Sequence, residues 1–517
     1  MNRVQKLIQT GVRCVYIIMI FIILANVLFG QNIDYSFKKD FPIHMAGYLL
    51  LGGIGIIGGY VLIMFLLGKL KKRFAWLCKI QVQRRIMAVV SGVTVLMLAV
   101  FAYHYFFVSG WDVLCVQHGA RALAFNHGQI DQFYFSSCPN NLMLMCIYAK
   151  ISTIGSWVGI GYVNLCCVLF QSILFAATGF LVFETIRMLF GGRTGVFAWI
   201  LYMLFIGFSP WMVVPYSDGT GLIFPVLIFY IYVCLRRNKR PMLCAFLLAC
   251  ISCFAYNIKP QLFIIGIAIT ILSVVEILTK MKSEKKIGAF AKGFVAVATG
   301  LAAGIVLVSS ITYIKGFELD TEANIGMLHY LKMGLNAESG GTYSIEDVQM
   351  SNSYLTRKER NNANLQEVFE RIEDMGPAGL LELGQKKLLT IYSDGTFGWW
   401  VEGGFLEGDI EAGHPKLREI LCSIYYPDGK YYPLFCNWVQ AIWLGVLTWG
   451  LCNAWEKDVK DEVSVLILSV IGLTLFELLF EARARYLFTY GPIYVITAIC
   501  GIVVVYKKII KSAYKSE

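Results

Sequence analysis

Long apolar runs dominate the chain and recur with short polar intervals between them. A helical run of about 20 apolar residues matches the thickness of a bilayer's hydrocarbon core. Lipid offers no partners for backbone polar groups, so runs of this length are typical of helices. The pattern predicts an all-α polytopic membrane protein with about twelve transmembrane helices. The predicted spans are residues 12–30, 45–68, 86–108, 158–190, 195–214, 219–235, 241–257, 261–279, 289–314, 434–452, 463–480 and 487–506.

The polar intervals carry positive charge on alternate sides of the spans. Lys and Arg precede the first span, and a dense basic cluster follows the second, at residues 69–85. Because cytoplasmic loops are enriched in Lys and Arg, both stretches are predicted to be cytoplasmic. Basic loops at 236–240 and 280–286 and the tail at 507–515 follow the same alternation. The protein is therefore predicted to lie in the cell membrane with both termini inside.

This topology divides the chain into four segments. They are two N-terminal spans with a basic cytoplasmic loop (1–85), a transmembrane core whose first external loop is 109–157 (86–314), an external soluble insert (315–432), and three C-terminal spans with a basic tail (433–517). The insert holds 19 of the 34 acidic residues, and apolar residues at helical spacing in 322–335 and 365–391 predict that it is α-rich. An apolar stretch at 142–154 is too short to span and is predicted to be an interfacial helix.

The composition excludes several classes of protein. Hydrophobic residues make up 57% of the chain and charged residues 15%, which excludes an ordinary soluble enzyme. The net charge of +11 resides in the basic loops, so the topology explains it without nucleic acid. Most of the 15 cysteines lie in apolar runs, which favours a packing role. Cys115 and Cys138 share an external loop, and their spacing leaves a disulfide between them open.

Polar side chains collect at the predicted outer ends of the spans. Ionisable groups near the hydrocarbon boundary are costly and are usually functional. We therefore expect one external cavity to be lined by Trp111, Asp112, Asn140, Asn141, Asp218, Lys259, Glu481, Arg483, Arg485 and Tyr486.

Asp112 opens the first external loop beside Trp111. A carboxylate in such a place can accept a proton from a hydroxyl group, which is the work of a general base. Asp112 also precedes a segment at 113–125 where it would suit the N-cap position of a helix. The two roles are compatible, and the sequence leaves both open.

Three cations lie on the side that the positive-inside rule disfavours. Arg483 and Arg485 offer bidentate forks and Lys259 a point charge, which together suit a phosphate or pyrophosphate group at the membrane surface. The alternative is that each side chain only anchors a helix end at the interface. Glu481 and Arg485 stand four residues apart, so an intrahelical ion pair is a further alternative.

Two other groups are assigned structural roles. The histidines His118, His127, His329 and His414 lack metal-ligand spacing and are interpreted as surface or packing residues, so no metal site is predicted. Residues 394–400 form a turn that ends in Trp399 and Trp400. These tryptophans suit a sugar platform or, somewhat better, an interfacial anchor.

Several motifs resemble those of the GT-C superfamily of membrane glycosyltransferases. They are Trp111-Asp112 at the start of an external loop, the run from Tyr134 to Asn141 that ends in Cys-Pro-Asn-Asn, Tyr216-Ser217-Asp218, and Asn257-Ile258-Lys259-Pro260. The stretches MLHYLKMGLN (327–336), DGTF (394–397) and EARARY (481–486) look like motifs of bacterial multispanning members, which are related to protein O-mannosyltransferases and the aminoarabinose transferase of lipid A. The resemblance extends from about residue 103 to the C-terminus.

This resemblance implies an activity. Members of the superfamily transfer a sugar, with inversion, from a polyprenyl-phosphate carrier to an acceptor on the outer face. Asp112 would be the general base, Lys259 and Arg485 would contact the carrier phosphate, and Asp218 would be a second carboxylate of a cavity that Tyr134 and Tyr216 also line. No cofactor is required, and because some relatives use a divalent metal, metal dependence stays open. The chain has Asp112-Val113 in place of the Asp-Glu pair of mannosyltransferases, which leaves the acceptor class unassigned.

Two other classes of protein compete with this interpretation. A transporter or flippase of lipid-linked or polymeric glycans commonly has twelve spans, but it binds near the midplane and usually carries internal repeats. This chain shows no repeat, and its ionisable residues lie at the predicted outer ends of the spans. A scaffold or sensor would leave Asp112, Asp218 and Lys259 without a shared purpose. The transferase is therefore favoured.

Overall fold

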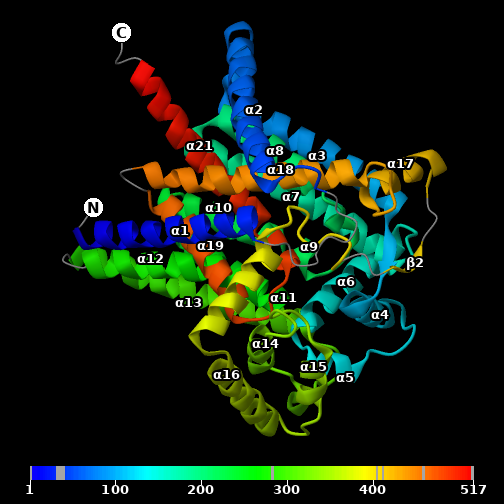
Figure 1. Cartoon of the computed structure of the whole chain (residues 1–517). Helices are drawn as coiled ribbons and strands as arrows, with labels where there is room; N and C mark the ends of the chain where they lie inside the picture. Colours follow the sequence, from blue (N-terminus) through cyan, green and yellow to red (C-terminus); the bar gives the residue numbers. More distant parts are fainter. Residues whose placement is uncertain are drawn as a thin grey trace.

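The computed structural model describes residues 3–30, 41–280, 284–402, 406–409, 413–456 and 460–513. Its helices are α1 (Arg3–Phe29), α2 (Met45–Arg73), α3 (Ile80–Tyr105), α4 (Trp111–Phe125), α5 (Gln132–Ser137), α6 (Asn140–Trp157), α7 (Val163–Phe190), α8 (Gly192–Tyr202), α9 (Ser217–Gly221), α10 (Ile223–Arg236), α11 (Pro241–Ile258), α12 (Ile264–Lys280), α13 (Glu284–Thr312), α14 (Met327–Gly334), α15 (Ile345–Asn352), α16 (Arg357–Tyr392), α17 (Pro415–Tyr425), α18 (Tyr432–Leu451), α19 (Asp461–Leu479), α20 (Ala484–Phe488) and α21 (Gly491–Ala513). Two short strands, β1 (Phe107–Ser109) and β2 (Leu406–Asp409), complete the fold (Figure 1). The predicted all-α class is confirmed.

Within the described ranges, eleven helical segments are long and apolar enough to cross a membrane. They coincide with eleven of the twelve predicted spans. The twelfth, predicted at 195–214, is instead a shorter apolar helix, Gly192–Gly207, whose last residues form a π-helical turn. Pro210, which has no N–H to donate to a preceding helical turn, then starts a separate 3₁₀ turn. A single continuous spanning helix over 195–214 is therefore not found.

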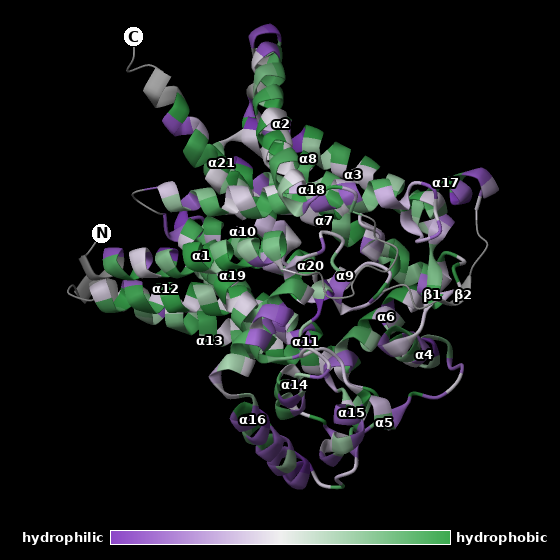
Figure 2. Cartoon of the chain, in the orientation of Figure 1, coloured by the Kyte–Doolittle hydropathy of each residue, from purple (hydrophilic) through white to green (hydrophobic). Residues whose placement is uncertain are grey.

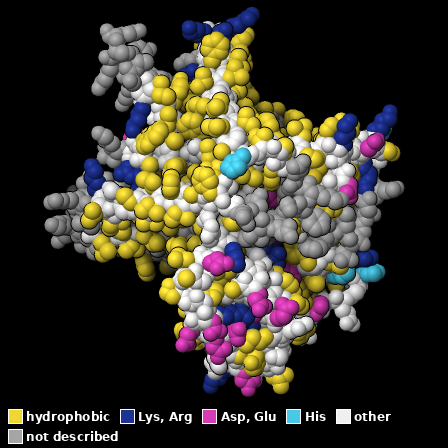
Figure 3. Space-filling view, viewed as in Figure 1, with side chains coloured by type: hydrophobic (Ala, Val, Ile, Leu, Met, Phe, Trp, Pro, Cys, Tyr) yellow, Lys and Arg dark blue, Asp and Glu magenta, His cyan; other side chains and the backbone are white. Residues whose placement is uncertain are grey.

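The termini and the polar segments lie at opposite ends of the helical body. Figure 1 places both ends of the chain on one side, while α4, α5 and α14–α16 lie on the other. Figure 2 shows green, hydrophobic ribbon on α1, α12 and α13 and purple, hydrophilic ribbon on the first half of α16. In Figure 3 acidic side chains gather over the same polar end. Which end faces the cytoplasm stays a prediction, and Lys282 and Lys515 of the basic segments lie outside the described residues.

The segment from 315 to 432 is helical where its apolar spacing predicted helices. Residues 322–335 contain α14, and residues 365–391 lie within α16, which bends where Gly376 adopts a positive φ of 56° before Pro377. The second half of α16 enters the core, where the Tyr392 ring stacks on Trp443 and its hydroxyl lies 2.6 Å from that of Thr474. This segment therefore packs directly against the spanning helices.

Two features of the first polar loop position the residues that follow it. Strand β1 pairs with β2 in an antiparallel ribbon, so the start of this loop is tied to the segment that follows Glu402. Helix α6 is longer than the predicted interfacial helix at 142–154, and Leu144, Met145 and Cys146 are fully buried within the protein. Its placement at a lipid interface stays a prediction.

Candidate active site

Asp112 lies in the first turn of α4, directly after β1. The N-cap residue of this helix is Gly110, and no side chain makes a capping hydrogen bond, so the alternative N-cap role of Asp112 is wrong. Trp111 adopts a positive φ of 51°, a conformation that is unfavourable for a bulky residue and often occurs at functional sites. Its indole N–H donates to the Ser109 hydroxyl at 3.0 Å. The strained tryptophan sets the direction of the turn that carries Asp112.

Phenol and amide groups surround the Asp112 carboxylate. The Tyr216 hydroxyl lies 3.2 Å from Asp112 Oδ2 and also 3.2 Å from Asn141 Oδ1. Asn141 Nδ2 donates to the Tyr134 hydroxyl at 2.6 Å. Burial, followed by the negative charge of Asp112, raises the pKa of both Tyr134 and Tyr216. Both phenols therefore stay protonated and can hydrogen-bond near the carboxylate, which itself is only half-buried.

A second cluster centres on Asp218, whose side chain is 1% exposed. One carboxylate oxygen pairs with Lys259 Nζ, and the other accepts from Arg485 Nη1 at 3.0 Å. Arg485 Nε also lies 3.4 Å from Glu402 Oε2. Lys259 and Arg485 are both buried, so their charged groups do not simply extend to a lipid interface. Both cations pair with Asp218, and Arg485 pairs with Glu402 as well. Each side chain carries further N–H groups that can bind an anion.

Aromatic rings join the two clusters. The Arg485 guanidinium lies 4.4 Å from the centre of the Trp111 ring and 5.5 Å from that of Tyr216. Lys259 Nζ lies 4.0 Å from the centre of the Tyr486 ring. Such contacts hold a cation by its attraction to the ring face and leave its N–H edges available. One continuous site therefore contains the half-buried Asp112 carboxylate and two buried cations.

The residues between α19 and α20 supply the rest of the predicted site. Glu481 accepts from Arg483 Nε at 2.9 Å and from the Tyr486 hydroxyl at 3.0 Å. Burial alone would raise the pKa of Glu481, but the charge and hydrogen bonds of Arg483 and its neighbours lower it. Because α19 ends at Leu479 and α20 begins at Ala484, residues 480–483 are not helical, and the intrahelical Glu481–Arg485 pair is wrong.

Asn140 is the predicted site residue with the weakest connection to the others. Its side chain is exposed and reaches the site only through a 3.3 Å hydrogen bond from Nδ2 to Asn141 Oδ1. The remaining predicted residues form one contact network that runs from Tyr134 to Arg483.

Three charged residues near this network were not predicted. Glu402 pairs with Arg485 and accepts from the Ala484 amide at 3.2 Å. Glu477 is fully buried within α19, and Lys387 projects from α16 toward the end of the same helix. Glu477 carried a usable signal, since it is a carboxylate inside an apolar run. Glu402 and Lys387 lie in polar stretches where no sequence pattern distinguishes them.

The structure also places the histidines, the tryptophan of the 394–400 turn and the two loop cysteines. His118, His127 and His414 are exposed, whereas His329 is buried beside the Ser351 hydroxyl at 2.8 Å. Trp399 is fully buried and donates to the Tyr425 carbonyl at 2.8 Å, so neither the sugar platform nor the interfacial anchor describes it. Cys115 and Cys138 are free thiols. Across the described ranges, no three His, Cys, Asp or Glu side chains are grouped as metal ligands.

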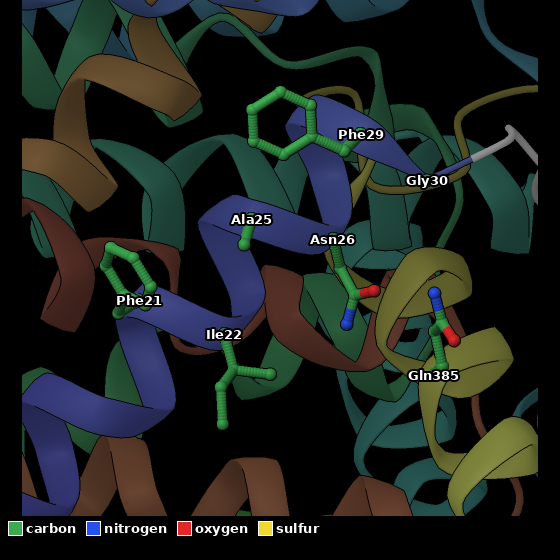
Figure 4. A pocket seen from close by; sticks show the side chains of 7 residues that line it. All are labelled: Phe21, Ile22, Ala25, Asn26, Phe29, Gly30 and Gln385. Atoms are coloured by element: carbon green, nitrogen blue, oxygen red, sulfur yellow. The ribbon is translucent and has the colours of Figure 1, made fainter.

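A pocket of about 300 Å³ lies apart from this site, between the end of α1 and α16 (Figure 4). It is lined by Phe21, Ile22, Ala25, Asn26, Phe29, Gly30 and Gln385. None of the predicted site residues belongs to it.

The fold and the site define a polytopic integral membrane protein with a buried charged cluster where its polar loops meet the spans. The family model of a conserved hypothetical integral membrane protein matches residues 4–503. The chain belongs to that family. No curated protein matches the chain.

Proposed function

We propose that this protein is a glycosyltransferase that moves a sugar from a polyprenyl-phosphate carrier to an acceptor on the outer face of the cell membrane. The acceptor would be a glycan, lipid or protein of the cell envelope. The observation that carries the proposal is the position of Arg485, which pairs with Asp218 and stacks on Trp111, the neighbour of Asp112. A transfer of this kind needs a base for the acceptor and cations for the leaving phosphate in one place.

The arrangement of these residues supports a direct displacement at the anomeric carbon of the sugar. Asp112 takes the proton of the acceptor hydroxyl as its oxygen bonds to the anomeric carbon of the sugar. The bond from that carbon to the phosphate oxygen breaks on the opposite face, so the configuration inverts, and the electron pair leaves with the polyprenyl phosphate. Lys259 and Arg485 stabilise the charge of the leaving phosphate, and Arg483 extends the positive edge. Asp112 then releases its proton to water.

The other predicted residues would orient these groups. Tyr216, Tyr134 and Asn141 form a hydrogen-bonded set beside Asp112 that can orient its carboxylate. Asp218 and Glu402 fix the position of Arg485 before the donor arrives, so little reorganisation remains for the reaction step. The supports for this function are the site geometry and the motif resemblance.

The test is binding of a polyprenyl phosphate to the purified protein in lipid nanodiscs, compared with the uncharged polyprenol of equal length. We expect the phosphate to bind at least roughly tenfold more tightly, because charge-assisted hydrogen bonds to two buried cations outweigh those to a hydroxyl group. Arg485→Lys should remove most of this preference, since a lysine offers neither the planar fork nor the same stacking on Trp111.

Arg236 provides a matched control because it is an ion-paired cation at the far end of the spans, bonded to Glu276 at 2.6 Å. Arg236→Met should keep the preference for phosphate. Equal binding of polyprenol and polyprenyl phosphate to the wild-type protein would contradict the proposed donor. Transport of the lipid across a vesicle membrane without any sugar transfer would favour the flippase instead.

A further inference from the structure

Lys387 ties three parts of the structure together from a fully buried position. Its side chain is 1% exposed, and its ammonium group donates to three backbone carbonyls. The acceptors are Gly334 at 2.8 Å, Leu478 at 2.8 Å and Phe480 at 2.7 Å. The three protons of an ammonium group are thereby all used.

The three carbonyls belong to two helix ends. Gly334 is the last residue of α14, and Leu478 and Phe480 flank the last residue of α19. The final carbonyls of a helix have no partner within the helix and carry a partial negative charge. An ammonium group supplied by α16 therefore caps α14 and α19 together.

The capped end of α19 leads directly into the candidate phosphate site. Only residues 480–483 separate α19 from α20, and these include Glu481 and Arg483. The Ala482 amide donates to the Gly341 carbonyl at 2.8 Å, so the α14–α15 loop also holds this link. A side chain at Gly334 would collide with the Phe480 backbone, which shows how closely the two chains approach.

We infer that Lys387 is a positioning residue for the phosphate site, through which the polar segment 315–432 holds the 480–483 link and thereby Arg483 and Arg485 in place. The inference rests on the proposed function for the nature of the ligand, but not for the clamp itself. The hydrogen bonds from Lys387 to Gly334, Leu478 and Phe480 all end on backbone carbonyls, so they act on the site through the backbone.

The charge of Lys387 is maintained at neutral pH. Burial lowers the pKa of its ammonium group to about 8, while the carboxylates of Glu477 and Glu481 act in the opposite direction. The group therefore stays mostly protonated at pH 7, as three carbonyl acceptors require.

The test measures hydrogen–deuterium exchange of the peptide that covers residues 478–486 in the full-length protein in nanodiscs. Lys387→Met keeps the apolar stem and removes every donor, whereas Lys387→Gln keeps two donors on a shorter stem. Lys386→Met is the matched control, because Lys386 precedes it on the same helix and is half exposed in a pair with Glu382. A polyprenyl phosphate serves as the probe of the site in all four proteins.

We expect exchange of this peptide to rise in Lys387→Met, to rise less in Lys387→Gln, and to match the wild type in Lys386→Met. Affinity for the polyprenyl phosphate should fall in the same order, by roughly tenfold in Lys387→Met, at temperatures where the variant is folded. A purely structural role would lower the unfolding temperature without this graded loss of affinity.

Two results would overturn the inference. One is unchanged exchange of residues 478–486 in both Lys387 variants. The other is raised exchange with unaltered affinity for the probe, which would show that the link does not position the site. If the wild-type protein does not bind the probe at all, the proposed function fails, and the exchange data alone then decide whether the clamp exists.

Discussion

The coupling between Asp218 and Arg485 can be measured by a double-mutant cycle. Asp218 is 1% exposed and its carboxylate receives both Lys259 and Arg485. Arg485→Met leaves Asp218 with one cation and removes the guanidinium beside Glu402. Removing one partner of a buried pair usually costs about 3–5 kcal/mol. Because Lys259 remains, we expect a loss of about 3 kcal/mol in the free energy of unfolding.

The second arm of the cycle removes the carboxylate. Asp218→Asn leaves Lys259 without its paired carboxylate and Arg485 with Glu402, and should also destabilise the protein. In the double variant neither the carboxylate nor the guanidinium remains, so its loss should be smaller than the sum of the single losses. We expect a coupling energy of about 1.5 kcal/mol or more, within the range of contacting residues.

Denaturant titration in mixed micelles, followed by tryptophan fluorescence, would give the four free energies. Arg236→Met and its partner variant Glu276→Gln supply a control cycle for a more exposed pair, with side chains 29% and 25% exposed. That coupling should be about 1 kcal/mol or less. Additivity within about 0.5 kcal/mol at Asp218 and Arg485 would refute the reasoning that these residues form one buried charge cluster.

Three further predictions follow from the described residues. Asp112→Asn should lower sugar transfer by roughly a hundredfold or more, because the proton acceptor is lost. The unfolding temperature should stay unchanged, because Asp112 does not cap the helix. Near-normal transfer, measured as sugar released from the carrier, would reject its role as base. Burial lowers the pKa of His329 from 6.5 to about 4, so its contribution to stability is complete above pH 6.5 and is lost as the pH falls toward 4, by about 1.4 kcal/mol per pH unit. Thermal unfolding of His329→Gln between pH 7 and pH 4.5 should show a weaker pH dependence than the wild type, and parallel curves would contradict this. Cysteines introduced at the exposed residues Asn126 and Glu338 should react with an impermeant thiol reagent in intact cells, and one at Asn238 should not. The reverse pattern would invert the topology.

The spanning helices could be predicted from the sequence because each depends on one local property, the length of an apolar run. The exception at 195–214 shows the limit of that property. The run is long enough, but Pro210 and the π-helical turn before it divide the run into shorter pieces. A hydropathy scale measures how favourably side chains transfer into lipid. It does not indicate where the backbone hydrogen bonds of a helix end.

The candidate site was predictable in its members and less so in its contacts. Lys259 and Arg485 stood out because cations at the predicted outer ends of spans are unusual. Nothing in the sequence paired them with Asp218, which lies 41 and 267 residues away. The local alternative for Arg485, a pair with Glu481 one helical turn away, failed because the backbone leaves the helix between them. Long-range pairing depends on how the helices assemble, and one sequence does not record that.

The ribbon between β1 and β2 has a consequence for attempts to produce the polar segment by itself. Strand β2 obtains its hydrogen bonds from β1, which belongs to the first polar loop. Tyr392 at the end of α16 packs on a ring of α18, and Lys387 needs acceptors at the end of α19. A fragment of residues 315–432 expressed alone would therefore expose an unpaired strand, an apolar helix end and a charge without acceptors. We expect such a fragment to aggregate, so antibodies and ligands against this region are best raised with the full-length protein in lipid.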